Sequence, residues 1–146
     1  MIRPARPEDA AAVERIVAEA YAPLAARMDK PPAPMLDDYP ARIAEGVVDV
    51  FDRDGAVLGM IILVDQPGAL MLENVAVASE ARGQGVGGRL IAHAEDVARS
   101  RGFERIRLYT HATMVENQAM YRHLGFAEIG RGEDEGYDRV QFEKRL

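Results

Sequence analysis

Residues 70–90 constrain the fold and chemistry of this chain more than any other stretch. The segment opens with an apolar run, LMLENVAV, that predicts a strand, and continues into a glycine-dense turn from Arg82 to Gly88. Apolar residues then recur at three- and four-residue spacing, as in a helix (Leu90, Ile91, Ala94, Val97 and Ala98). A strand, a glycine turn and a helix place several backbone N–H groups at one helix N-terminus. Such a place binds anions, most often phosphate.

Two familiar nucleotide-binding patterns fit these glycines only in part. Gly83, Gly85 and Gly88 match the GxGxxG pattern of dinucleotide-binding folds, which also requires an acidic residue about 20 positions later, at the tip of the next strand. The next expected strand, residues 106–111, ends in Thr-His instead. A P-loop would require Lys and Ser or Thr where this chain has Arg89 and Leu90. We therefore expect neither nicotinamide binding nor nucleotide hydrolysis.

A third interpretation fits the turn and a second segment together. The pattern R-x-x-G-x-G, which begins at Arg82, resembles the Q/R-x-x-G-x-G/A signature of the GNAT superfamily of acyl-CoA-dependent N-acetyltransferases. Further on, ENQAMYRHLGF is similar to the second hallmark of that family, with Asn117, Tyr121 and the pair Gly125-Phe126 in the expected order. The resemblance covers essentially the whole chain. It implies a GNAT fold and an enzyme that transfers acetyl from acetyl-CoA to a primary amine.

Hydrophobic periodicity predicts a mixed α/β sheet with the element order β-α-α-β-β-β-α-β-α-β-β, which is the order that the GNAT fold implies. Turn signals such as Arg53-Asp54-Gly55 and Gln66-Pro67-Gly68 separate three consecutive strands. The strands are expected at residues 2–4, 47–52, 56–64, 70–77, 106–110, 126–130 and 140–142. The helices are expected to begin at residues 7–9, to span 37–45, to follow the glycine turn, and to span 115–124.

Length and composition narrow the class of protein. A chain of 146 residues predicts one domain, 1–146, and 48% hydrophobic with 29% charged residues is ordinary for a globular protein. No apolar run approaches the roughly 20 residues of a membrane span, and no apolar signal segment is visible near the N-terminus. We therefore expect a cytoplasmic protein that does not enter a membrane.

Charge and cysteine content exclude several functions. The net charge of −6 at pH 7, without a basic cluster, speaks against nucleic-acid binding and suits a cationic amine acceptor. The absence of cysteine excludes disulfides, thiolate metal sites and a cysteine nucleophile. The three histidines lie on three different expected elements, so we expect no metal site.

The resemblance assigns roles to residues of both hallmarks. It implies that backbone groups of the glycine turn, with the Arg82 side chain, hold the pyrophosphate of acetyl-CoA, and that Tyr121 protonates the leaving thiolate. The resemblance also implies that Tyr121 contacts the cofactor, and its four-residue spacing from Asn117 predicts both on one helical face. The expected cofactor contacts are Val75, Ala76, Val77, Arg82, Gly83, Gln84, Gly85, Val86, Gly87, Gly88, Asn117 and Tyr121.

The sequence says less about the residues that would activate and bind the amine than about those that would bind the cofactor. Glu73 is a carboxylate in an apolar strand, so it is either the catalytic base or a glutamate on an exposed face, and both remain open. The expected acceptor contacts are Arg27, Tyr39, Asn74, Tyr109 and His111, with Met35 in the same segment as Arg27 and Tyr39.

Three functional hypotheses remain at this point. The first is a transferase that acetylates a small-molecule amine by direct attack, without an acyl-enzyme. The second is a non-catalytic module that senses acyl-CoA or acts as a scaffold. The third is a protein N-acetyltransferase. Homodimers are common in the family, and a homodimer is therefore a further possibility.

Overall fold

The computed structural model describes residues 1–146, with the element order that the sequence predicts. The strands are β1 (Ile2–Pro4), β2 (Val48–Arg53), β3 (Ala56–Gln66), β4 (Ala69–Val77), β5 (Arg105–His111), β6 (Ala127–Asp134) and β7 (Tyr137–Arg145). The helices are α1 (Ala10–Ala25), α2 (Tyr39–Ala44), α3 (Val86–Ser100) and α4 (Val115–His123). Three short 3-10 helices are η1 (Pro7–Asp9), η2 (Ala33–Leu36) and η3 (Ser79–Ala81). The strands follow the order β1-β2-β3-β4-β5-β7-β6 in a mixed sheet.

The chain divides into two compact units, so the expectation of a single domain stays a prediction. The N-terminal unit comprises Met1–Leu63 and Asn74–His93, and the C-terminal unit comprises Val64–Glu73 and Ala94–Leu146. Strand β4 and helix α3 each contribute residues to both units.

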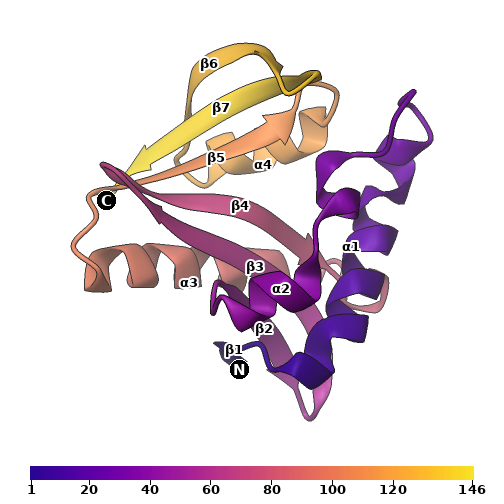
Figure 1. The fold of residues 1–146 in the computed structure, drawn as a ribbon. Helices are drawn as coiled ribbons and strands as arrows, with labels where there is room; N and C mark the ends of the chain where they lie inside the picture. Colours follow the sequence, from indigo (N-terminus) through magenta and orange to yellow (C-terminus); the bar gives the residue numbers. More distant parts are fainter. The chain divides into compact units, whose positions relative to one another are not determined.

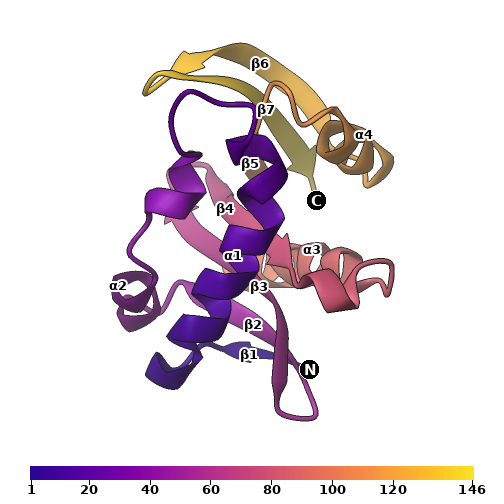
Figure 2. The same cartoon turned by 90° about the vertical axis from the view of Figure 1, so that its right-hand side faces the viewer.

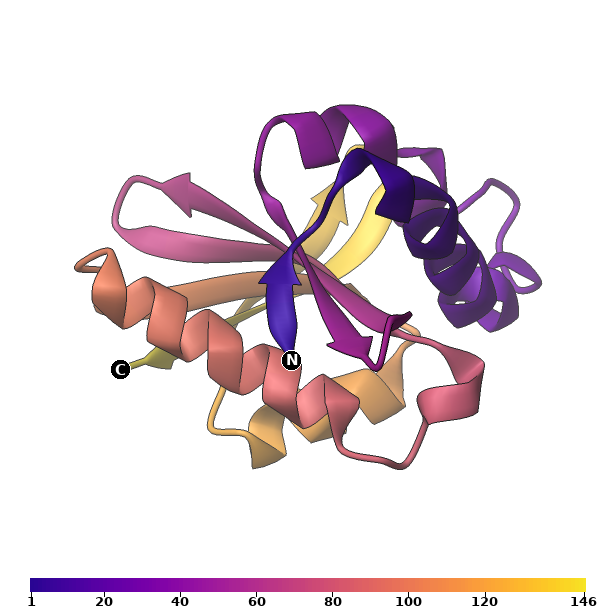
Figure 3. The same ribbon diagram turned by 90° about the horizontal axis from the view of Figure 1, so that it is seen from below.

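In the N-terminal unit, helices pack on the antiparallel strands β1, β2 and β3. Figure 2 shows α1 lying across these strands with α2 beside it, and Figure 3 shows the beginning of α3 on their opposite side. The residues of α1 that face inward recur at helical spacing and are almost fully buried (Val13, Ile16 and Val17). Each such side chain contributes roughly 1.5–3 kcal/mol to folding.

Gly59 of β3 is what allows α3 to approach the strands so closely. A Cβ atom at this position would lie 3.0 Å from Leu90 Cδ1, 3.0 Å from Val86 Cγ1 and 3.3 Å from the carbonyl oxygen of Ala76. Leu90 and Val86 are buried, so neither side chain has space into which it could move. The first turns of α3 are therefore seated directly on β3.

The C-terminal unit is built around β5. Residues Leu70–Leu72 of β4 pair in parallel with Ile106–Leu108, and this ladder ends three residues before β5 does. On its other side β5 pairs antiparallel with β7, which pairs in turn with β6. Figure 1 shows β5, β7 and β6 side by side, with α4 packed next to them. The aromatic rings of Tyr121, Phe126 and Phe142 meet in this core.

The β6–β7 hairpin is longer than the sequence indicates. Its two-residue turn has positive φ at both positions, Glu135 (52°) and Gly136 (81°), as a type I′ turn requires. The expected strands 126–130 and 140–142 extend to Ala127–Asp134 and Tyr137–Arg145, because backbone pairing continues to the turn. Strand β6 is exposed along almost its whole length, so it lacks the alternation that would have indicated its true end. No helix is long and apolar enough to cross a membrane.

A charged cluster fixes β1 to the start of α1. Arg3 donates two hydrogen bonds to the Asp9 carboxylate, at 2.8 and 3.1 Å, and a third to Asp52 at 3.0 Å. The backbone N–H of Arg6 also donates to Asp9, at 2.7 Å. These bonds, chiefly those from Arg3, hold the pKa of the Asp9 carboxyl below its usual value.

Because the pKa of Asp9 is lower in the folded than in the unfolded state, its stabilisation is complete above the unfolded pKa of about 4 and is lost as pH falls further. We predict that Asp9→Asn lowers the free energy of unfolding by about 1–3 kcal/mol at pH 7. Urea unfolding from pH 7 to pH 3 should show the two proteins converging below about pH 4. A difference that stays constant over this range would show that the charge of Asp9 contributes nothing.

Candidate functional site

The glycine turn, residues 82–88, joins β4 to α3 through two left-handed glycines. Gly83 has φ of 76° and Gly85 has φ of 79°, values that a residue with a side chain adopts only with strain. The first helical hydrogen bond of α3 runs from Arg89 N–H to the Gly85 carbonyl, at 3.1 Å. The N–H groups of the three residues between them therefore have no partner within the helix, and they point out of its N-terminus (Val86, Gly87 and Gly88).

Side-chain contacts hold the turn in this shape. The Gln84 amide donates to the Glu80 carbonyl at 3.1 Å and accepts a hydrogen bond from Arg53, from the β2–β3 turn, at 2.6 Å. The backbone N–H of Gln84, expected to contact phosphate, donates in this structure to the carbonyl of Ala81 at 3.3 Å. The available donors are accordingly concentrated after Gly85.

Before the turn, η3 is tied to α1. The Glu19 carboxylate accepts hydrogen bonds from the backbone N–H of Ser79 at 3.3 Å and from its hydroxyl at 3.1 Å. These two bonds are the main cause of a lowered pKa of Glu19, to which Arg15 also contributes. Helix α1 thus fixes the point at which the chain enters the glycine turn.

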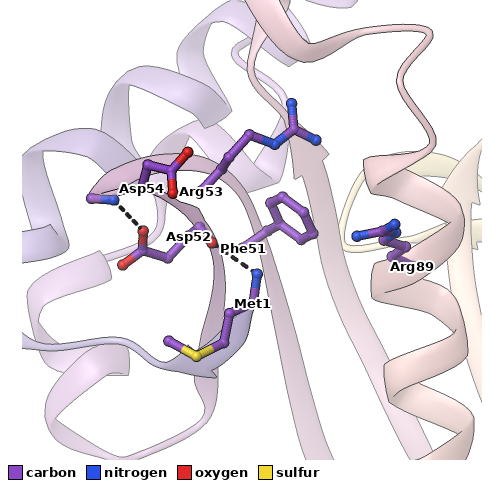
Figure 4. A pocket seen from close by; sticks show the side chains of 7 residues that line it. Met1, Phe51, Asp52, Arg53, Asp54 and Arg89 are labelled. Carbon is purple, nitrogen blue, oxygen red and sulfur yellow. Dashed lines mark hydrogen bonds between the residues drawn. The ribbon is translucent and has the colours of Figure 1, made fainter.

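Three arginines near the turn have no carboxylate partner. Most arginines of the chain form ion pairs, and Arg53, Arg82 and Arg89 are among those that do not. Figure 4 shows Arg53 and Arg89 on either side of Phe51, with guanidinium carbons 5.6 and 5.9 Å from the ring centre. They line a shallow hollow at the β2–β3 turn. Asp52 and Asp54 line the same hollow, so its charge is mixed.

Strand β4 is buried up to Leu72 and alternates in exposure from Glu73 onward. Glu73 is exposed, Asn74 is 5% exposed, and the following residues alternate between half-buried and buried (Val75, Ala76 and Val77). Val77 Cγ2 lies 3.7 Å from where a Cβ of Gly87 would be, so Val77 faces α3. Asn74 and Ala76 consequently face the other side of the strand.

Asn74 is bonded to two tyrosines in the N-terminal unit. Tyr21 of α1 donates to Asn74 Oδ1 at 2.8 Å, and Asn74 Nδ2 donates to the Tyr39 hydroxyl at 3.2 Å. Burial raises the pKa of Tyr21 to about 12. It also raises the pKa of Tyr39, to which the nearby charge of Asp37 adds. The structure thus brings together two of the expected acceptor contacts, Tyr39 and Asn74, and adds Tyr21. Tyr21 follows Val17 at helical spacing, but a helical period carries no signal for a hydrogen-bond partner.

The C-terminal unit holds the second hallmark on α4. Asn117 and Tyr121 lie on this helix as their spacing predicts, Asn117 half-buried and Tyr121 5% exposed. The Tyr121 ring packs edge-on against Phe126, with 5.8 Å between ring centres. Gln118, which the sequence analysis did not single out, is 3% exposed and donates to the carbonyls of His111 and Ala112. It fixes the connection between β5 and α4.

The other expected acceptor contacts lie nearer the surface. Tyr109 of β5 is 39% exposed, and the Arg139 guanidinium lies 5.5 Å from its ring centre. His111 ends β5, where its Nδ1 accepts from the N–H of Thr113 at 3.2 Å. Arg27 is exposed just after α1. No group of three or more acidic or histidine side chains could hold a metal ion, and metal independence stays a prediction.

Comparisons with known proteins identify the family. Residues 11–126 match the acetyltransferase (GNAT) family, and the chain belongs to it. Over 64 residues the chain is 44% identical to N-alpha-acetyltransferase 80 of Mus musculus. This match covers 44% of this chain and 19% of that protein. Over 79 residues it is 34% identical to mycothiol acetyltransferase of Beutenbergia cavernae, covering 53% of this chain and 27% of that protein. The chain therefore spans less than a third of the length of either relative.

The fold is similar to that of solved acetyltransferases. A PaiA N-acetyltransferase from Thermoplasma acidophilum, in complex with coenzyme A, superposes with a TM-score of 0.82 at 19% identity, covering 100% of this chain and 98% of that one. The family and the fold class predicted from the sequence are thus confirmed.

Proposed function

We propose that this chain is an N-acetyltransferase that transfers acetyl from acetyl-CoA to the primary amine of a small molecule. The observation that carries the proposal is the glycine turn, where N–H groups without a helical partner meet the unpaired Arg82. A pyrophosphate fits such a place, because glycines let its oxygens approach the backbone closely. The solved relative that holds coenzyme A supports the same cofactor here.

The remaining binding roles follow the family pattern. The backbone of Val75, Ala76 and Val77, together with the Asn117 side chain, would bind the pantetheine arm of acetyl-CoA. Arg27, Tyr109 and His111 stay proposed contacts of the acceptor amine. The names of the two curated relatives describe different acceptors, so a protein N-terminus is the alternative acceptor.

In the proposed reaction the amine nitrogen attacks the thioester carbonyl carbon directly. A new C–N bond forms, the C–S bond breaks, and the products are an amide and the free thiol of CoA. Only about one alkyl amine in a thousand is neutral near pH 7.4, so a base that takes the ammonium proton accelerates the attack. Glu73, exposed on an otherwise apolar strand, is the proposed base. Tyr121 is the proposed acid, which gives its phenolic proton to the leaving thiolate.

The cofactor assignment predicts a specific effect at Gly85. Calorimetric titration should show micromolar binding of acetyl-CoA and none of NAD or ATP. We expect Gly85→Ala to weaken acetyl-CoA binding at least tenfold, because a side chain at positive φ distorts the turn, at a cost of about 1–2 kcal/mol. Gly46→Ala is the matched control, since Gly46 has φ of 77° and equally open surroundings but lies after α2. Equal binding by both variants would remove the glycine turn from the site.

The acid role predicts that Tyr121→Phe lowers kcat about 10²–10⁴-fold and leaves the Kd of acetyl-CoA nearly unchanged. Phenylalanine keeps the ring contacts with Phe126 and Phe142, so the fold should persist. Release of the CoA thiol measures turnover, with hexylamine, 2-phenylethylamine and alanyl-leucine amide as first acceptors. Tyr137→Phe, another buried tyrosine of the same unit, is the control and should keep its kcat. An unaltered kcat in Tyr121→Phe would eliminate the acid role.

The base role predicts a change in the pH–rate profile. A carboxylate base is active above its pKa, so kcat/KM should fall as pH drops through that value. In Glu73→Gln this acidic limb should disappear, and the rate should approach that of the wild type only at high pH, where the amine is neutral without help. Glu133→Gln, an exposed glutamate of β6, serves as the control. If the limb persists in Glu73→Gln, another group is the base.

The sensor or scaffold alternative makes the opposite prediction for turnover. A protein that binds acetyl-CoA with micromolar affinity but acetylates neither the small amines nor the dipeptide amide would be a binding module. Acetylation of the dipeptide amide alone would favour a protein acceptor.

A further inference from the structure

Three polar side chains of the N-terminal unit form one directional chain of hydrogen bonds. Tyr21 donates to the carbonyl oxygen of the Asn74 amide, and the amide nitrogen donates to the hydroxyl of Tyr39. The Tyr39 hydroxyl donates in turn to the backbone carbonyl of Pro34. We name these four residues the β4 clasp, because they join α1, α2 and η2 to a single residue of β4.

The centre of the β4 clasp, Asn74 and Tyr39, is buried, whereas Tyr21 and Pro34 are half-buried. Asn74 is 5% exposed and Tyr39 is 3% exposed. An amide in such surroundings is costly unless both of its ends are bonded, and here each end has a tyrosine partner. An apolar side chain at position 74 would have required no partner. The hydrogen bonds of the β4 clasp therefore specify one arrangement of the segments that they join.

At one end the β4 clasp holds a segment with little structure of its own. Residues 26–38 contain three prolines and only the one-turn helix η2, whose Met35 and Leu36 are exposed to 36% and 66%. Proline removes backbone donors, so few main-chain bonds can hold this segment. The bond from Tyr39 to Pro34 attaches it to the start of α2 and, through Asn74, to β4.

At the other end the β4 clasp reaches α1, because Tyr21 donates to Asn74 Oδ1 at 2.8 Å. The η2 segment is therefore tied through Asn74 to α1 as well as to α2.

We propose that Asn74 is a positioning residue: held by Tyr21 and Tyr39, it fixes the η2 segment to β4, and with it the segment that would contact the acceptor amine. This inference rests on the proposed function. It differs from the sequence-based expectation that Tyr39 and Asn74 contact the acceptor, because their polar atoms are bonded to one another. The clasp shares no hydrogen bond with the glycine turn, so we expect its variants to keep the Kd of acetyl-CoA nearly unchanged.

Hydrogen exchange tests the restraint without any ligand. In Tyr39→Phe, amide exchange in residues 33–38 should rise at least tenfold, with the Met35 N–H, bonded to Pro32 at 2.9 Å, as the reporter. Exchange in α3 should stay as in the wild type. Tyr137→Phe is the control for loss of a buried phenol elsewhere. Unchanged exchange in residues 33–38 would show that the clasp does not hold the segment, and would overturn the inference.

Kinetics test the positioning role. With the best acceptor among hexylamine, 2-phenylethylamine and alanyl-leucine amide, Tyr21→Phe and Tyr39→Phe should each lower kcat/KM for the amine about tenfold. The Kd of acetyl-CoA should stay within about twofold of the wild type. Because both tyrosines act through Asn74, the double variant should lose much less than the product of the two single losses.

The remaining outcomes distinguish a failure of the positioning role from a failure of the proposed function. A purely structural clasp would lower Tm in these variants but leave kcat/KM unchanged below the transition, and this would overturn the positioning role. If the wild type acetylates none of the three amines, the proposed function fails and the positioning role fails with it. Exchange in Tyr39→Phe would still show whether the clasp holds the η2 segment.

Discussion

The first turn of α3 cannot satisfy its own N–H groups, and much of the N-terminal unit is arranged around that fact. Two glycines with positive φ open the chain ahead of the helix, and Gly59 lets the helix sit directly on β3. Glu19 of α1 and Arg53 of the β2–β3 turn then hold the approach to the turn from two sides. The unpaired donors are consequently presented by a rigid frame rather than by a mobile loop, which is what tight phosphate binding requires.

The charged residues of this protein differ in whether they form ion pairs with one another. Arg3 bonds to both Asp9 and Asp52, and this cluster stabilises the attachment of β1. Arg82 has no such partner. Glu73 differs from both groups, because it is a carboxylate on an exposed position of an apolar strand. A charge without a carboxylate partner in the fold is the better candidate for binding an anion, and this is why the proposed function rests on Arg82 rather than on the many ion pairs.

Local patterns predicted the fold well, because its signals lie within single segments. The stripe of α1, the turn at residues 53–55 and the glycine turn each depend on neighbours in sequence, and the predicted order of elements is confirmed. The extent of β6 was not predictable, because an edge strand exposed on both faces has no period. The bonds of Asn74 were also out of reach, since Tyr21 lies 53 residues away and Tyr39 35 residues away. Long-range polar pairs leave no trace in the spacing of one sequence.

Tyr121 shows why a packing role and a chemical role need not compete. Its ring lies against Phe126 and Phe142, so the aromatic body contributes to the core of the C-terminal unit as any buried phenylalanine would. The hydroxyl is the only part that phenylalanine lacks. A buried tyrosine whose ring fixes its orientation delivers its proton at a defined place, with little loss of side-chain freedom during the reaction. The same burial that suggests a merely structural tyrosine is therefore what a well-placed general acid requires.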